Sequence, residues 1–468
     1  MTTTLPELLH HTSTIAAAFL DSLPTRHVGA VDRPDALRAR LERPTPEHGE
    51  SPARIVDELV RDLDGGLVAS AGPRYFGFVN GGSVPAALAA DWLVTAWDQN
   101  AGLFASSPAA AIVEEVTSRW ILDVLGLPAT ATVGFVTGCQ MANVTCLAAA
   151  RHRVLDRVGW NVGDDGLVGA PPITVVIGDE AHVTIPRALG LLGLGRTRVV
   201  RVPADDQGRM RIDALTQILE SVGPTLIVCA QLGNVHTGAM DPIGDIADAT
   251  HERHGWLHVD GAFGLWARAS PEQASGADGA DRADSWATDG HKWLNVPYDS
   301  GLAIVADGDA HRAAMSGTAA YLVQHGGHVD PMTYVPEASR RARGLGIHAA
   351  IRCLGRRGIA DLVDRCCALA RRFAERLGAE DGIDVLNDVV LNQVLVRFTH
   401  GNERVSDELT RAVVVQVQQA GVCWLGGSNW RGREVMRISV SNWSTTAADV
   451  DKSADAILAA LARARASL

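Results

Sequence analysis

Lys292 is the residue of this chain whose type and position best suit covalent chemistry. The 42 basic residues include two lysines, Lys292 and Lys452, and all the others are arginines. Lys452 stands in the acidic, alanine-rich run 447–456, which is typical of the solvated face of a closing helix. Lys292 follows Gly290 and His291 between two short apolar runs, and its amine can lose a proton and add to a carbonyl, which a guanidinium cannot do. A lysine kept at a loop by chance would fit this residue alone equally well, so its surroundings must decide.

Three further polar groups stand where an expected strand gives way to a loop or a helix. Asp260 follows the strand expected at 256–259, and His182 lies between the strand expected at 173–177 and a helix. The turn 138–140 (Gly-Cys-Gln) leads from a strand into a helix, and the free N–H groups and positive dipole end of such a helix suit a phosphate. Taken singly, these groups have simpler explanations: an N-cap, a hydrogen-bonded turn residue and a helix entry.

Together with Lys292, these groups are the ones that pyridoxal phosphate (PLP) requires. An amine binds the cofactor's aldehyde, a carboxylate keeps the pyridine nitrogen protonated so that the ring accepts electrons, and a flat side chain fixes the tilt of the ring. None of the simpler explanations accounts for all four groups. The residues therefore predict pyridoxal 5'-phosphate as a cofactor.

The elements that would position these groups alternate between strands and helices from residue 131 onward. Apolar strands are expected at 132–136, 173–177, 198–202, 225–230 and 256–259, with helices between them. This alternation predicts an α/β fold with a mainly parallel sheet covered on both faces, and an active site in the loops that follow the strands. His182, Asp260 and Lys292 all fall in such loops.

The remainder of the chain shows helices before this region and a mixed pattern after it. Helices are expected at 5–20, 53–63, 85–97 and 108–125, with an exposed connection at 33–52. Residues 307–336 lack clear periodicity and form a candidate mobile active-site loop. A helical stretch at 347–377, strand-like runs at 385–398 and 435–441 and a terminal helix complete the chain.

These patterns predict three parts. Residues 1–70 form an N-terminal helical segment, which has too few helices to bury a core and would pack on another domain or on a partner subunit. Residues 71–345 form the large cofactor-binding domain, and residues 346–468 form a smaller C-terminal α+β domain.

Composition narrows the class of protein. The 468 residues are 47% hydrophobic and 21% charged, and the net charge of −12 argues against nucleic-acid and anionic-membrane partners. No apolar run approaches the roughly 18 residues of a membrane span, and residues 1–21 lack the cationic start of a signal peptide. The seven cysteines form an odd set without metal-ligand spacing, which favours free thiols in a reducing compartment. We expect a cytoplasmic protein without a metal site.

Two segments resemble one family closely. HVDGAFG at 258–264 and DGHKWL at 289–294 are similar to the HVDAAYGG and D-x-H-K-W motifs of the PLP-dependent amino-acid decarboxylases of group II, which include aromatic-L-amino-acid, glutamate and cysteine-sulfinate decarboxylases. The resemblance extends from about residue 73 to the C-terminus. Weaker agreements are Ser107-Pro108 with Glu114, residues 179–182, Thr237-Gly238 with Asp241-Pro242, and residues 436–442.

The resemblance implies the aspartate-aminotransferase fold (fold type I) and an obligate homodimer with active sites at the subunit interface. It also implies a role for individual residues. Lys292 would be the Schiff-base lysine, Asp260 the partner of the pyridine nitrogen, and His182 the side chain stacked on the ring. The phosphate would be held by Gly138, Cys139, Gln140 and His291. The substrate carboxylate would be held by Arg437.

This chain departs from the family pattern in two places, and one further assignment lies in a variable loop. The phosphate turn is Thr-Gly-Cys-Gln where relatives often have serines, and Gly261 and Phe263 replace an alanine and a tyrosine. Residues 319–325 resemble the family's catalytic loop, which makes Tyr321 the proton donor to Cα and Tyr334 its nearby competitor. Relatives with phenylalanine there release an aldehyde, so a tyrosine favours the amine.

The substrate side chain is predicted from aromatic and amide residues near the start of the large domain. An apolar or aromatic pocket would be lined by Tyr75, Phe76, Phe78, Trp97 and Phe104. Gln99 and Asn100 could instead bind a carboxylate. We expect decarboxylation of a hydrophobic or aromatic L-amino acid to the amine and CO2. The alternatives are an oxidative aldehyde synthase, a decarboxylase of an acidic amino acid such as glutamate or aspartate, an aminotransferase and a non-catalytic scaffold.

Overall fold

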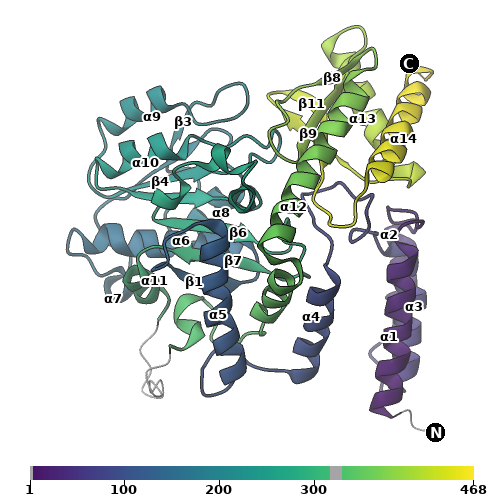
Figure 1. Ribbon diagram of the computed structural model, residues 1–468, viewed down its shortest axis with the longest axis horizontal. Helices are drawn as coiled ribbons and strands as arrows, with labels where there is room; N and C mark the ends of the chain where they lie inside the picture. Colours follow the sequence, from purple (N-terminus) through teal and green to yellow (C-terminus); the bar gives the residue numbers. More distant parts are fainter. Residues whose placement is uncertain (1–3, 317–328, 468) are drawn as a thin grey trace. The chain divides into compact units, whose positions relative to one another are not determined.

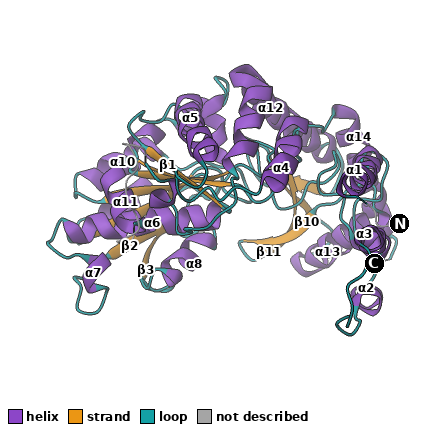
Figure 2. Cartoon of the chain, turned by 90° about the horizontal axis from the view of Figure 1, so that it is seen from below, coloured by secondary structure: helices purple, strands orange, loops and turns teal. Residues whose placement is uncertain are grey.

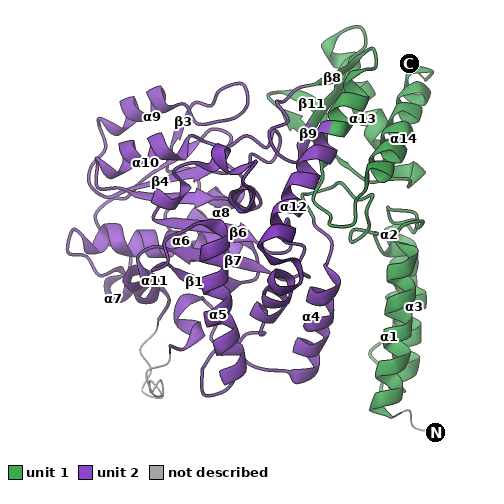
Figure 3. Cartoon of the chain, in the orientation of Figure 1, with its two compact units in different colours: residues 1–80, 372–385, 395–468 green, residues 81–371, 386–394 purple. Residues whose placement is uncertain are grey.

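The structure is a computed structural model that describes residues 4–316 and 329–467. It divides into two units (Figure 3). The first unit comprises residues 1–80, 372–385 and 395–468, and the second comprises residues 81–371 and 386–394. The predicted division into residues 1–70, 71–345 and 346–468 stays a prediction.

The second unit is built on a seven-stranded sheet (Figure 1). Its strand order is β1-β7-β6-β5-β4-β2-β3. The strands are β1 (Thr132–Val136), β2 (Thr174–Gly178), β3 (Val199–Val202), β4 (Leu226–Gln231), β5 (Trp256–Asp260), β6 (Ser285–Asp289) and β7 (Gly301–Val305). Among them, β7 runs antiparallel to both of its neighbours, β1 and β6, and the other neighbouring pairs are parallel. The predicted α/β class with a mainly parallel sheet is confirmed.

The second unit also contains helices, several of which cover the faces of this sheet (Figure 2). They are α4 (Pro85–Trp97), α5 (Pro108–Leu125), α6 (Cys139–Asp156), α7 (Val162–Asp165), α8 (Thr184–Leu191), α9 (Ile212–Leu219), α10 (Ile243–His251), α11 (Gly308–Met315) and the larger part of α12 (Gly344–Gly378). Helix α6 contacts β5, β6 and β7. It carries small buried residues such as Ala142, Cys146 and Ala149, which allow its backbone to approach the strands closely.

The first unit contains helices from both ends of the chain and a small sheet. The helices are α1 (Leu5–Ser22), α2 (Pro34–Leu41), α3 (Pro52–Leu63), α13 (Glu403–Ala420) and α14 (Ala447–Arg465). The sheet has the order β10-β11-β9-β8, with β8 (Ile383–Val385), β9 (Gln393–Phe398), β10 (Gly426–Trp430) and β11 (Arg433–Ser439).

Several expected elements are confirmed in detail, and a few are wrong. The strand 132–136 and the helices 85–97 and 108–125 have the expected bounds. The expected connection 33–52 contains α2, because Pro34 occupies the first helical turn, where its missing N–H costs nothing. The stretch 307–336 contains α11, whose N-cap Asp307 accepts the N–H of Ala310 at 2.9 Å. The single run 385–398 is two strands, β8 and β9.

Within the described residues, no helix is both long enough and apolar enough to cross a membrane.

Candidate active site

Three of the predicted PLP-binding residues, Gly138, His182 and Asp260, lie at one edge of the sheet of the second unit, together with Gln231 and Asp289. Strands β4, β5 and β6 end at Gln231, Asp260 and Asp289, respectively. Gly138 follows β1, and His182 follows β2. Because these five strands run in the same direction, their carboxyl ends face the same edge. The loops that the sequence predicts to build the site thus lie at the same edge of the sheet.

Asp260 is held in one orientation by hydrogen bonds to both carboxylate oxygens. Its Oδ2 accepts from Asn143 Nδ2 and from Thr184 Oγ1, both at 3.3 Å. Its Oδ1 accepts from the N–H of Ala262 at 3.2 Å and lies 3.4 Å from the thiol Sγ of Cys139. The side chain is 4% exposed. A buried carboxylate fixed by this many donors is suited to accept a hydrogen bond from a ring nitrogen.

Behind Asp260 lies a chain of buried polar groups that the sequence did not single out. Asn143 Oδ1 is 2.8 Å from His258 Nε2, and His258 Nδ1 is 2.9 Å from Ser285 Oγ. Trp256 Nε1 donates to the same Ser285 Oγ at 2.9 Å. Burial lowers the pKa of His258 to about 4, so its ring is neutral. Because Asn143 uses its amide nitrogen as a donor to Asp260, its oxygen must accept, and the proton of His258 is therefore on Nε2.

Lys292 lies beside a second buried carboxylate. Its side chain is 18% exposed, and its Nζ is 3.2 Å from Asp289 Oδ2. The ammonium also lies 6.0 Å from the ring centre of Phe263. Burial lowers the pKa of Lys292, but nearby negative charge, that of Asp289 above all, outweighs burial and raises the pKa above its ordinary value. The lysine is thus enclosed and charge-paired, and does not stand on an open loop.

His182 is tied to the same network. Its Nδ1 is 2.8 Å from Thr184 Oγ1, and its backbone N–H donates to Gln231 Oε1 at 3.2 Å. The N–H of Gln231 donates in turn to Asp241 Oδ2 at 2.8 Å. His182 and Asp260 line one small pocket together. The structure therefore brings together the predicted stacking residue and the predicted pyridine partner.

The beginning of α6 offers donors for an anion. Gly138 precedes the helix and packs against Gly301, where an added Cβ would overlap with the backbone of Gly138. Close by, the Oγ of Ser300 and the Nδ1 of His291 are buried and have no hydrogen-bond partner among the described residues. Because buried polar atoms are normally paired, these orphaned atoms and the helix dipole fit the phosphate of PLP. Ser300 is a candidate phosphate-binding residue that sequence reasoning missed.

Tyr298 is a second residue that the sequence did not indicate. Its ring stacks on that of His291, with the centres 4.1 Å apart. Tyr298 is 60% exposed as a whole, and partial desolvation of its hydroxyl with the charge of Asp289 raises its pKa to about 12.

The predicted substrate residues of the second unit lie near α4. Trp97 is 53% exposed, and Gln99 Nε2 donates to its carbonyl at 2.9 Å. Asn100 Oδ1 accepts the N–H groups of Gly102 and Arg340, both at 3.1 Å. Phe104 lines a separate cavity of about 610 Å³ together with Tyr334 and Glu114.

Four further predicted residues belong to the first unit. The ring of Tyr75 stacks on that of Trp424 at 5.0 Å, and Phe78 packs on the same indole at 5.3 Å. Phe76 is 1% exposed and packs edge-on against Phe373, which is the environment of a core residue. Arg437 lies in β11, and burial lowers its pKa. The predicted substrate contacts of these four residues stay predictions.

Of the two candidate proton donors, the structure describes Tyr334. Tyr321 lies outside the described residues. The hydroxyl of Tyr334 is 3.4 Å from Arg312 Nη1, and its ring centre is 5.1 Å from that of His311.

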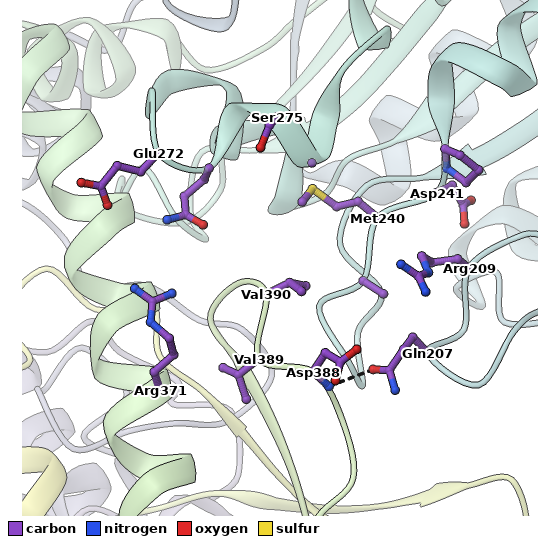
Figure 4. A pocket seen from close by; sticks show the side chains of 14 residues that line it. Gln207, Arg209, Met240, Asp241, Glu272, Ser275, Arg371, Asp388, Val389 and Val390 are labelled. Atoms are coloured by element: carbon purple, nitrogen blue, oxygen red, sulfur yellow. Dashed lines mark hydrogen bonds between the residues drawn. The ribbon is translucent and has the colours of Figure 1, made fainter.

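A further cavity of about 400 Å³ adjoins the loop after β4 (Figure 4). Met240 and Asp241 line it, and Arg209, Glu272 and Arg371 add charged groups around it. Asp241 also lines the small pocket of His182 and Asp260. Burial raises the pKa of Asp241 to about 6.

The sequence and the fold are similar to those of known PLP-dependent proteins. A family model described as the pyridoxal-dependent decarboxylase conserved domain matches residues 34–399. Aromatic-L-amino-acid decarboxylase of Bacillus atrophaeus is 25% identical over 438 residues, which cover 91% of this chain and 89% of that protein. 4-Hydroxyphenylacetaldehyde synthase of Rhodiola rosea is 27% identical over 425 residues, which cover 87% of this chain and 85% of that protein. The crystal structure of Oryza sativa TDC with PLP and tryptamine matches with a TM-score of 0.91 and 23% identity, and covers 98% of both chains.

The chain therefore belongs to the pyridoxal-dependent decarboxylase family, and it has the type I fold of PLP-dependent enzymes. It is a PLP-dependent enzyme that decarboxylates an amino acid. The predicted family, fold, cofactor and enzyme class are confirmed.

Proposed function

We propose that this decarboxylase acts on an L-amino acid with a hydrophobic or aromatic side chain and releases the amine and CO2. The observation that carries the proposal is the engagement of Asn100. Its oxygen accepts the N–H groups of Gly102 and Arg340, and its amide nitrogen lies 3.5 Å from Ser339 Oγ. The Gln99 amide is engaged with the carbonyl of Trp97. The two amides that would favour an acidic substrate are thus hydrogen-bonded within the chain, which supports the hydrophobic or aromatic class over the acidic one.

Each of the proposed PLP-binding residues of the second unit would have its own role. PLP supplies a conjugated ring that accepts the electron pair of the bond to the leaving carboxylate. Lys292 would hold the aldehyde of the cofactor, and Asp260 would keep a proton on the ring nitrogen. His182 would lie against the ring, with Thr184 fixing the orientation of the imidazole at 2.8 Å.

The phosphate would lie at the start of α6. Gly138, Cys139 and Gln140 would approach it with their backbone, and His291 and Ser300 with their side chains. This assignment is supported by the two orphaned buried atoms of His291 and Ser300.

The aldehyde is the second candidate product, and the relationship to 4-hydroxyphenylacetaldehyde synthase favours it. The proposed choice of the amine depends on Tyr321 as the proton donor to Cα. Tyr321→Phe is expected to shift the product from amine to aldehyde with consumption of oxygen, whereas Tyr334→Phe is expected to leave the product unchanged.

We also propose a cytoplasmic homodimer in which the N-terminal segment packs on the partner subunit. In α1, none of the residues is buried, and Leu5 and Leu9 are 66% and 57% exposed. Ile55 and Leu59 of α3 are similarly open, at 43% and 47%. Apolar side chains exposed in series are typical of a surface that a partner covers. Light scattering coupled to size-exclusion chromatography tests this: a monomer at micromolar concentration would contradict it.

The substrate and product are tested together by mass spectrometry. The PLP-loaded enzyme is mixed in air with a panel of L-amino acids, with and without a keto acid. Amines from aromatic or large apolar acids support the proposal, and amines from glutamate or aspartate contradict it. Product that requires the keto acid would indicate an aminotransferase. Lys292→Ala should abolish product, and Lys452→Ala, which changes the other lysine of the chain, should not.

A further inference from the structure

Asp289 places a negative charge at the start of α6. Its Oδ1 accepts the N–H of Cys139 at 2.5 Å, and its Oδ2 is 3.2 Å from Lys292 Nζ. Oδ1 also lies 3.4 Å from His291 Nε2. The residue is 2% exposed. A carboxylate of the protein therefore contacts three of the residues proposed to bind PLP.

The backbone holds Asp289 in this place. Its N–H donates to the carbonyl of Ala262 at 2.9 Å, and its carbonyl accepts from Trp266 Nε1 at 3.0 Å. A Cβ added to Gly138 would lie 3.4 Å from Asp289 Oδ1, so the carboxylate is in close contact with the turn. Rotation of the side chain can change its hydrogen bonds, but the charge stays beside the start of α6.

We propose that Asp289 tunes how tightly the enzyme holds the phosphate of its cofactor, because its carboxylate competes with the phosphate for the N–H of Cys139. This inference rests on the proposed placement of the phosphate at residues 138–140. A neutral acceptor at position 289 could take the same N–H without repelling a phosphate dianion. The carboxylate thus lowers the selectivity of the site for PLP over an analogue without the phosphate, and makes the cofactor easier to exchange.

The size of the effect follows from burial. Two like charges a few ångströms apart repel more strongly in a protein interior than in water, by enough to change an equilibrium constant about tenfold or more. Lys292 offsets part of this repulsion while it carries a proton. With PLP bound, the positive charge that Lys292 would present to Asp289 depends on whether its nitrogen is protonated. The positive end of the α6 dipole would then stabilise two anions, the Asp289 carboxylate and the phosphate.

The test compares two aldehydes that differ in the phosphate. Dissociation constants of PLP and pyridoxal are measured by absorbance titration of the full-length, cofactor-depleted protein. The variants are Asp289→Asn, Asp289→Ser and, as control, Asp307→Asn, which removes one charge from the N-cap of α11. Any change in the reactivity of Lys292 affects both aldehydes and cancels in the ratio of the two constants. Inorganic phosphate serves as a third probe, competing with PLP.

Asp289→Asn should raise the preference for PLP over pyridoxal about tenfold or more, and inorganic phosphate should compete at lower concentration than in the unmodified protein. Asp289→Ser should change the preference in the same direction if the asparagine variant does not fold, and Asp307→Asn should leave it unchanged. A preference that stays the same or falls in both Asp289 variants overturns the inference. Failure of the unmodified protein to bind PLP covalently would instead contradict the proposed function.

Discussion

The side-chain amide of Asn143 donates to the carboxylate of Asp260 at 3.3 Å while its oxygen accepts from the ring of His258 at 2.8 Å. Asp260 and His258 lie two positions apart on β5, so their side chains leave the strand on the same face. Asn143, on the first turns of α6, bridges them. The orientation of the proposed pyridine partner is thus set by a neutral histidine and an amide rather than by a positive charge.

Asn143→Ala should reduce activity more than it reduces substrate binding. Loss of a hydrogen bond to a charged group costs about 1.5–3 kcal/mol, which corresponds to a fall in kcat of about 10- to 150-fold if the whole cost is felt in the chemical step. Steady-state kinetics measure this, with Asn161→Ala, an exposed cap of α7, as control. A change confined to KM would show that Asn143 does not act through Asp260.

His258 should make stability fall in mild acid. Its pKa is about 4 in the folded protein because it is buried, against 6.5 for an exposed histidine, so the unfolded chain binds the proton first. The free energy of unfolding therefore decreases as the pH falls from about 6.5 to about 4, by up to about 3 kcal/mol from this residue, and is unaffected above that window.

Urea unfolding at several pH values measures this effect as the difference between the unmodified protein and His258→Gln. The difference removes the contributions of other groups, including His311, whose pKa burial also lowers to about 4. A difference that does not change between pH 7 and pH 4 would show that His258 is not a buried neutral base.

Asp289→Asn should make Lys292 more reactive at neutral pH. The charge of Asp289 is the foremost of those that raise the pKa of Lys292, and a neutral amine is the form that attacks an aldehyde. The rate of covalent attachment of pyridoxal should therefore rise, and its pH profile should move to lower pH. Asp307→Asn provides the control, and an unchanged profile in Asp289→Asn would argue against the ion pair.

Gly301→Ala should destabilise the protein and impair PLP binding. An added Cβ would overlap with the backbone of Gly138 at the start of α6, and such overpacking costs about 1–3 kcal/mol. Gly223→Ala is the matched control, because a Cβ there has nothing within 4 Å. Thermal unfolding and PLP titration should separate the two variants; equal behaviour would mean that α6 can shift without loss.

The sequence predicted the central part of this structure well because its signals are local. The strand 132–136 is an apolar run followed by a glycine turn, and the helices at 85–97 and 108–125 each begin with a proline. Asp260 and Lys292 were found because a strand end and a rare residue type can be recognised in sequence. The antiparallel pairing of β7 depends on tertiary contacts, which local patterns do not show. Helix α2 was missed although Pro34 opens it as Pro85 and Pro108 open α4 and α5, because the Pro- and Glu-rich composition of 33–52 favoured an exposed connection.

The residues that sequence reasoning missed act through distant partners. Asn143 lies inside a helix, and its role is visible only because His258 and Asp260 face it. Ser300 is an ordinary polar residue until burial leaves its hydroxyl without a partner among the described residues. Asp289 stood within a recognised motif, but its hydrogen bond to Cys139 spans 150 positions of the chain.

The central claim is that Lys292 carries the cofactor, and reductive trapping tests it most directly. The PLP-loaded protein is treated with borohydride, which fixes the bond between the lysine nitrogen and the cofactor, and is then digested and analysed by mass spectrometry. The chain has one other lysine, Lys452, so the result is unambiguous. We predict the mass of reduced PLP on the peptide that contains Lys292 and its absence in Lys292→Ala. Label on Lys452, or on neither lysine, would contradict the account.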